Sequence, residues 1–301
     1  MDLASLVRVF DVWRLGYLQQ QIMLTRPRSL ARIAPTEPWF RTREELLTKS
    51  RRASTLLGLL SFQVSATLAI NQQKIFMHHL PCLILIRHAQ SENNALPDHL
   101  RVSDPNITQL GVVQAKKLAM AVRALEPTTL YCSPFLRSLE TTRPVAEVTG
   151  LRPVVRQDIY EQGGCHRGYL PNPRIAERGM GRDALSQRYA NWHLDERIEE
   201  TGWFDLDHYE TREEANHRAQ RVKAWLETES QTHSPSDRVA MVIHADFKLR
   251  LIEALLDDLE IEYKLGDVVN TSITRLSKVS GRWRLDYWNV FSHLSANEIS
   301  A

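Results

Sequence analysis

Residues 83–94 read LILIRHAQSENN, and this stretch decides the fold class. Its first four residues form a continuous apolar run, without the polar alternation of a half-exposed strand. Such a run is typical of a strand that is buried on both faces of a parallel sheet. The change to polar residues predicts that the strand ends at Arg87 and His88, at one edge of that sheet.

Downstream of this stretch, strand patterns alternate with helical patterns. The further predicted strands are 128–132, 154–160, 239–243, 272–277 and 283–288. The first predicted helix is 109–125, capped by Thr108, and the second, about 134–149, begins at Pro134 and stops before Gly150. A third helix begins at the capping box of residues 211–214, and a fourth spans 246–256. Alternating strands and helices predict an α/β fold, a three-layer α/β/α sandwich with a mostly parallel central sheet.

The charge of the chain is distributed unevenly along its length. The 301 residues are 43% hydrophobic and 25% charged, an ordinary globular composition. Residues 1–76 carry 11 lysines and arginines against 5 acidic residues, a net charge of +6, whereas the remainder carries −4. We therefore divide the chain into a basic N-terminal extension, 1–76, and a body, 77–301. No dense basic stripe with interleaved aromatic residues occurs, so no nucleic-acid partner is expected.

The N-terminal extension has several interpretations. Residues 53–73 are uncharged, but the most apolar part, 53–70, falls short of the about 20 apolar residues of a membrane helix. An ordinary helix or a poorly ordered leader is therefore favoured over a membrane anchor or an organelle-targeting segment, and a cytoplasmic location is expected. A third interpretation is that residues 1–76 are dispensable and that Met77 is the native start.

The cysteines argue for a reducing compartment. Cys82, Cys132 and Cys165 are few and odd in number, so a disulfide framework is not expected. Cys165 precedes His166, but no second pair stands at metal-ligand spacing, and no metal site is predicted. The sequence does not indicate an oligomeric state.

Histidine and arginine residues gather where the predicted strands end. Two strands end in His88 and His244, and a third ends at Ser133, with Arg137 one helical turn further on. Open α/β sheets bind ligands at the carboxyl ends of their strands, so we expect these side chains and Arg87 to converge. The guanidinium fork matches two phosphate oxygens, and a neutral imidazole is a competent nucleophile. The pattern therefore indicates a site for a phosphoryl group.

Five ordered segments resemble motifs of the histidine phosphatase superfamily, the phosphoglycerate mutase-like proteins. They are RHAQSENN (87–94), ITQLGVVQA (107–115), SPFLRSLETT (133–142), IYEQGG (159–164) and VIHA (242–245). The resemblance covers residues 82–294 and implies that the body, 77–301, is a histidine phosphatase domain with the phosphoglycerate mutase-like fold.

The resemblance also implies how the matched residues hold the phosphoryl group. His88 would be the nucleophile that becomes phosphorylated. Arg87, Arg137 and His244 would bind the phosphoryl oxygens and stabilise the charge that is spread over them during transfer. Asn94 matches the loop asparagine of the family and would donate to the phosphate.

An acid is implied as well. Glu161 would protonate the leaving oxygen and then activate water, with Asp158 as the alternative acid. The family often has glycine after each catalytic histidine, where this chain has Ala89 and Ala245. Alanine still allows close approach of the backbone, so Ala245 is placed with the substrate-binding residues.

The superfamily contains phosphatases and mutases. Well-known mutases have a loop rich in glycine and arginine after the first motif, and residues 95–105 lack that glycine pattern. A phosphoric monoester hydrolase is therefore favoured. It would act on a small phosphorylated molecule through a phosphohistidine, with no metal or cofactor. A phosphoglycerate mutase-type phosphotransferase and a non-catalytic binding protein are the alternatives. Residues 162–238 are expected to form a lid-like insertion.

Overall fold

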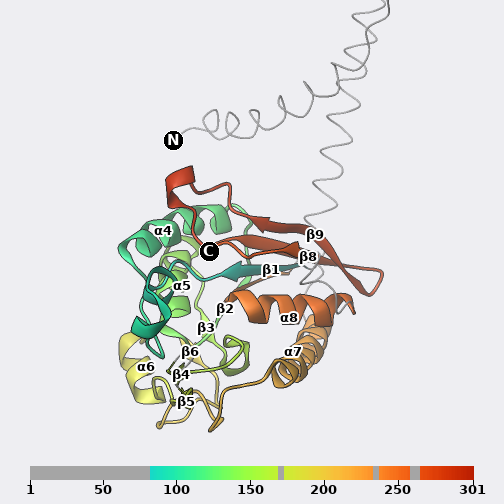
Figure 1. The fold of residues 1–301 in the computed structure, drawn as a ribbon. Helices are drawn as coiled ribbons and strands as arrows, with labels where there is room; N and C mark the ends of the chain where they lie inside the picture. Colours follow the sequence, from blue (N-terminus) through green and yellow to red (C-terminus); the bar gives the residue numbers. More distant parts are fainter. Residues whose placement is uncertain (1–81, 169–172, 233–236, 258–264) are drawn as a thin grey trace, which may run out of the picture. The chain divides into compact units, whose positions relative to one another are not determined.

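The computed structural model describes residues 82–168, 173–232, 237–257 and 265–301 (Figure 1). The predictions for the extension 1–76, for its apolar stretch and for a start at Met77 lie outside these residues. Within the described ranges, none of the helices combines the length and the apolar character that crossing a bilayer requires.

A seven-stranded sheet forms the centre of the domain, in the order β6-β3-β2-β7-β1-β8-β9. The strands are β1 (Cys82–Arg87), β2 (Thr129–Cys132), β3 (Val154–Val155), β6 (His193–Leu194), β7 (Arg238–Ile243), β8 (Ile273–Val279) and β9 (Arg282–Val290). The pairs from β6 to β1 are parallel, and β8 and β9 add two antiparallel strands at the other edge. The predicted mostly parallel sheet is confirmed.

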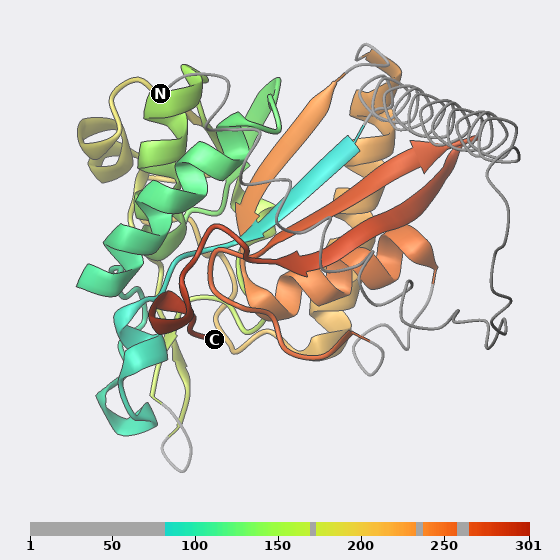
Figure 2. The ribbon, with the colours of Figure 1, turned by 90° about the horizontal axis from the view of Figure 1, so that it is seen from above.

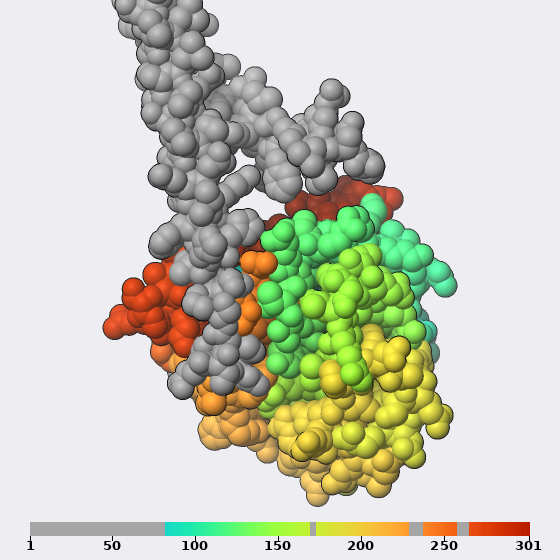
Figure 3. All heavy atoms as spheres, turned by 180° about the vertical axis from the view of Figure 1, so that it is seen from behind, coloured from blue at the N-terminus to red at the C-terminus, as the bar shows by residue number. Residues whose placement is uncertain are grey.

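Helices cover both faces of the sheet (Figures 1 and 2). The α-helices of the described residues are α3 (Glu92–Ala95), α4 (Gln109–Arg123), α5 (Leu136–Thr149), α6 (Arg182–Arg188), α7 (Arg212–Thr232) and α8 (Ala245–Leu256). The helices α4 and α5 pack together on one face, where Figure 3 shows them in green beside the yellow residues of the insertion. The helices α7 and α8 pack together on the other face. The three-layer prediction is therefore confirmed.

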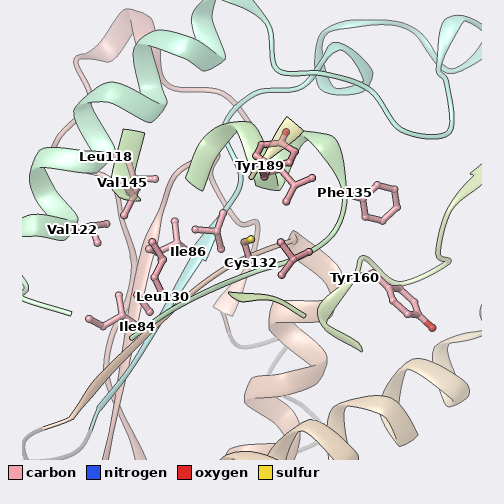
Figure 4. Packing of buried hydrophobic residues seen from close by; sticks show 14 of the residues in the cluster. Ile84, Ile86, Leu118, Val122, Leu130, Cys132, Phe135, Val145, Tyr160 and Tyr189 are labelled. Atoms are coloured by element: carbon pink, nitrogen blue, oxygen red, sulfur yellow. The ribbon is translucent and has the colours of Figure 1, made fainter. Parts of the chain in front are cut away.

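The apolar run of β1 serves both layers at once. Ile84 and Ile86 belong to a buried cluster with side chains of α4 and α5 (Figure 4). Leu83 and Leu85 belong to the opposite cluster, with side chains of α7 and α8. Successive strand residues point to opposite faces, so a strand between two helical layers needs apolar residues at every position. Each such side chain contributes about 1.5–3 kcal/mol by leaving water.

The helices begin largely where the sequence predicts. The hydroxyl of Thr108 accepts a hydrogen bond from the Gly111 amide and caps α4. The helix α5 begins at Leu136 instead of at Pro134, so that prediction was wrong by two residues. The reason is that Phe135 is extended, with a ψ of 136°, so that the first helical amide, of Leu136, donates to the carboxylate of Asp104 over 2.8 Å. Gly150 ends α5 in the left-handed conformation, as glycine allows.

The prediction of a strand over residues 154–160 is wrong beyond Val155. Only Val154–Val155 forms a strand, and residues 157–159 form a 3₁₀ turn. The carbonyls of Asp158 and Tyr160 accept hydrogen bonds from the guanidinium of Arg218 instead of from a neighbouring strand. The chain therefore leaves the sheet early.

The segment 162–238, expected as a lid-like insertion, contains elements of different kinds. A hairpin of β4 (His166–Arg167) and β5 (Ile175–Ala176) stands apart from the central sheet. In contrast, β6 extends the central sheet and α7 belongs to a helical layer. The predicted capping box is present at the start of α7, where Thr211 and Glu214 exchange hydrogen bonds. A lid function for the remainder stays a prediction.

Candidate active site

The site lies at the carboxyl ends of three neighbouring strands, β2, β7 and β1. The parallel register pairs Arg87 with Ile243, so the next residues, His88 and His244, stand at the same level. The His88 amide donates to the Ile243 carbonyl over 2.9 Å, and the two imidazole centroids are 5.1 Å apart. The first turn of α5 adds Arg137, whose guanidinium reaches His88.

The hydrogen bonds of His88 define which ring nitrogen carries its proton. Nδ1 lies 2.7 Å from the Ala89 carbonyl, which can only accept, so Nδ1 is protonated. Nε2 accepts a hydrogen bond from Arg137 Nε over 3.2 Å. Burial, followed by the positive charges of Arg137 and Arg87, lowers the pKa of His88 well below its usual value. The imidazole is therefore neutral, and its Nε2 lone pair, which faces Arg137 in the free protein, can attack phosphorus once that guanidinium turns to the phosphoryl oxygens.

Two buried donors beside His88 can bind an anion. Within the described part of the chain, Arg87 Nε and His244 Nδ1 are buried and lack a hydrogen-bond partner. Buried polar atoms in folded proteins nearly always have one. His244 Nε2 lies 2.7 Å from the Ser133 hydroxyl and 3.4 Å from the Ser138 hydroxyl, either of which can donate to it. When a serine hydroxyl donates to Nε2, the proton of the neutral imidazole sits on Nδ1, which can then donate to a phosphoryl oxygen.

Glu161 lies at the N-terminus of α8. Its Oε1 accepts hydrogen bonds from the amides of Phe247, over 2.9 Å, and Gln162, over 2.8 Å. Burial and the neighbouring charge of Asp246 raise the pKa of Glu161 to about 7, although these amides and Arg137 act in the opposite direction. The carboxyl can therefore release and take up a proton near neutral pH.

The two remaining predicted site residues are Asn94 and Ala245. The Oδ1 of Asn94 accepts hydrogen bonds from the amide and the hydroxyl of Ser91, both over 3.0 Å. This amide oxygen therefore shapes the turn after His88. Ala245 is the first residue of α8, directly after His244. The two roles assigned to them toward substrate stay predictions.

The residues behind His88 were not predicted from the sequence. The His88 carbonyl accepts hydrogen bonds from the Asn270 side chain, over 3.0 Å, and from the Thr271 amide, over 3.2 Å. Thr271 has a φ of 57°, which is rare for a β-branched residue. The Ala89 amide donates to the Thr141 hydroxyl over 2.9 Å. Thr141 lies within the motif of residues 133–142, which is a signal in the sequence, whereas Asn270 and Thr271 belong to none of the five motifs.

The sequence of this domain also matches a family model. The model of the histidine phosphatase superfamily (branch 1) matches residues 83–290, which is more than half of the chain. The chain belongs to the histidine phosphatase superfamily. Phosphoserine phosphatase 1 of Hydrogenobacter thermophilus is 36% identical over 76 residues, covering 25% of this chain. The match spans 36% of the length of that relative.

Solved structures share the fold of this chain. A structure named mycobacterial hydrolase 1 has a TM-score of 0.51 and 23% identity, covering 70% of this chain and 98% of that one. Mycobacterial glucosyl-3-phosphoglycerate phosphatase in complex with VO3 has a TM-score of 0.50 and 24% identity, covering 70% and 99%. Phosphoserine phosphatase of Entamoeba histolytica has a TM-score of 0.50 and 18% identity, covering 72% and 100%.

Proposed function

We propose that this histidine phosphatase domain hydrolyses phosphomonoesters of small molecules through a phosphohistidine at His88. The observation that carries the proposal is the neutral imidazole of His88, with its unprotonated Nε2 against the guanidinium of Arg137. Nucleophile, cationic donors and a carboxyl that titrates near neutral pH lie together, as a two-step phosphoryl transfer requires.

In the first step, Nε2 of His88 attacks phosphorus and the bond from phosphorus to the ester oxygen breaks. The protonated carboxyl of Glu161 gives its proton to the leaving oxygen, which departs as an alcohol. In the second step, the Glu161 carboxylate takes a proton from water while the water oxygen attacks phosphorus. The bond from phosphorus to nitrogen breaks, which restores His88, protonates Glu161 and releases inorganic phosphate.

The positive groups stabilise the charge of the transferring phosphoryl group. Arg87 and Arg137 keep their charge at all relevant pH values and present planar donors to its oxygens. His244 adds a neutral donor through Nδ1. Donors that are held in place before the reaction need no reorganisation as charge develops, which is the main source of such catalysis.

The names of the similar proteins support a substrate class. They include phosphatases of phosphoserine and of glucosyl-3-phosphoglycerate, which are small phosphorylated metabolites. We therefore propose a small phosphorylated metabolite as substrate. A screen of such compounds, with and without a bisphosphorylated sugar-acid primer, tests the assignment. Release of inorganic phosphate without primer is expected, whereas isomerisation that depends on the primer would show a mutase.

The proposed chemistry needs no metal, because arginine side chains supply the positive charge at the site. Exhaustive chelation is therefore expected to leave kcat and KM of the full chain unchanged within about 2-fold. Removal of a catalytic metal would have a far larger effect, because such a metal contributes several kcal/mol to transition-state stabilisation. The measurement is phosphate release before and after dialysis against a chelator. Loss of activity that a divalent cation restores would contradict the prediction.

The role of Glu161 predicts a pH dependence. Because the protonated form is needed in the first step, kcat/KM for esters with poor leaving groups should fall as pH rises through about 7. The Glu161→Gln variant cannot donate this proton, so its kcat/KM should fall by about 10²-fold for esters with poor leaving groups. The fall should be much smaller for para-nitrophenyl phosphate. The measurement is a pH profile of kcat/KM for an alkyl and an aryl phosphate.

The alternative acid, Asp158, provides the matched comparison. Its carboxylate forms ion pairs with Arg156, over 2.7 Å, and Arg197, over 3.2 Å. Asp158→Asn should therefore not distinguish between the two esters. Equal losses for both esters in Glu161→Gln would assign Glu161 a purely positional role or return the acid role to Asp158.

A further inference from the structure

Arg218 is a buried cation that the proposed chemistry does not use. It lies on α7 with 1% of its surface exposed, on the same stripe of the helix as the buried residues Ala215 and Val222. Its Nε and one terminal nitrogen donate to the two carboxylate oxygens of Glu210, over 2.7 and 2.6 Å. Both side chains of this ion pair are almost completely buried.

The other terminal nitrogen of Arg218 holds the backbone that leads to Glu161. It donates to the Asp158 carbonyl over 3.1 Å and to the Tyr160 carbonyl over 2.9 Å. The Tyr160 carbonyl belongs to the peptide group that joins Tyr160 to Glu161. A displacement of this guanidinium therefore moves the main chain at Glu161 itself.

Two aromatic rings, one beside Glu161 in the chain and one on α8, contact the guanidinium. The centroid of the Tyr160 ring lies 3.7 Å from the guanidinium carbon of Arg218. The centroid of the Phe247 ring lies 4.0 Å from the same carbon. The amide of Phe247 is the one that donates to Glu161 Oε1. Arg218 thus contacts both the residue that precedes Glu161 and the residue that binds its carboxylate.

The energetics of a buried ion pair also favour a positional role. Such a pair often contributes no more stability than apolar residues of similar volume, because both charges lose their hydration. In some proteins such a pair instead selects one conformation of the chain. Here the planar fork fixes one carboxylate and two carbonyls together, which the single nitrogen of a lysine cannot do.

We propose that Arg218 is a positioning residue that holds the carboxyl of Glu161 against the N-terminus of α8. This inference rests on the proposed function, because it concerns the acid of that reaction. Arg218 does not touch the reacting atoms, and its effect on turnover passes through Glu161.

A double-mutant cycle between Arg218→Lys and Glu161→Gln tests the proposal in the full chain. Arg218→Lys alone should lower kcat for an alkyl phosphate by about 10- to 100-fold, because small misplacements of a catalytic group have effects of this size. In the Glu161→Gln background the same change should cost less than about 3-fold, since residues that act as a unit are not additive. Arg221→Lys, an exposed arginine on the same helix, is the control and should leave both backgrounds unchanged.

The pH profile supplies a readout that a purely structural role would not move. The hydrogen bond from the Phe247 amide of α8 lowers the pKa of Glu161, so losing it should shift the upper limb of kcat/KM to higher pH. Equal fold losses in both backgrounds, with an unmoved limb, would overturn the proposal. If Arg218→Lys does not fold, as judged by circular dichroism, Glu210→Gln is carried through the same cycle with the same criteria. Failure of the wild-type chain to hydrolyse any ester would instead overturn the proposed function.

Discussion

His88→Ala is expected to lower kcat for para-nitrophenyl phosphate by more than about 10⁴-fold, the scale seen when a covalent nucleophile is removed. Alanine has no lone pair that can attack phosphorus, and Glu161 alone gives no covalent route. His88 is buried at the end of β1, so the shorter side chain leaves a small space without disturbing the surface. The loss should appear in kcat, because Arg87 and Arg137 still bind the phosphoryl group.

The measurement combines steady-state kinetics with trapping of the intermediate. Wild-type enzyme quenched in base during turnover should show phosphohistidine, and His88→Ala should show none. His208→Ala is the matched control, since His208 is an exposed histidine that pairs with Asp207 and Glu214. Wild-type turnover in His88→Ala, or phosphohistidine at another position, would refute the mechanism.

Arg137→Ala is expected to have the second largest effect, a loss of about 10³-fold in kcat/KM, the lower end of what a transition-state arginine contributes. The guanidinium donates to the attacking nitrogen in the free enzyme and lies beside the oxygens that gain charge during transfer. Arg137→Lys should recover only part of this loss, because lysine keeps the charge but not the planar fork.

A shift in pH dependence accompanies this loss. Arg137 is the leading charge that lowers the pKa of His88, so removing it should raise that pKa. The nucleophile would then become protonated at higher pH, and the acid limb of kcat/KM should move upward. Arg143→Ala, on the same helix and paired with Glu140, is the control. An unchanged acid limb together with less than about 10-fold loss would show that Arg137 does not act on His88 or on the phosphoryl group.

The sequence predicted the parts of the fold that depend on neighbouring residues. The apolar run before His88 is long enough, and uniform enough, to require burial on both faces of a sheet. The strand ends then place His88 and His244 together, since parallel strands share one edge. The predicted strand 154–160 was wrong beyond Val155, because a guanidinium from a distant helix binds the backbone carbonyls of Asp158 and Tyr160.

The resemblance named the candidate residues, but not what holds them. Nothing in the sequence around Arg218 distinguishes it from the other arginines of the insertion, except that it stands on an apolar stripe. Asn270 lies 182 residues from His88 and still binds its carbonyl. Contacts between such distant positions leave no periodic pattern, so reasoning on local spacing cannot find them.

The sequence by itself determined the layered α/β fold, the edge at which the site forms and the types of residue that meet there. Only the tertiary structure decided that His88 is neutral with Nε2 unprotonated, and that Glu161 titrates near pH 7. The physical reason is that these properties depend on burial and on charges brought together by folding. Protonation follows the surroundings in space, whereas periodicity and motifs follow the order of residues along the chain.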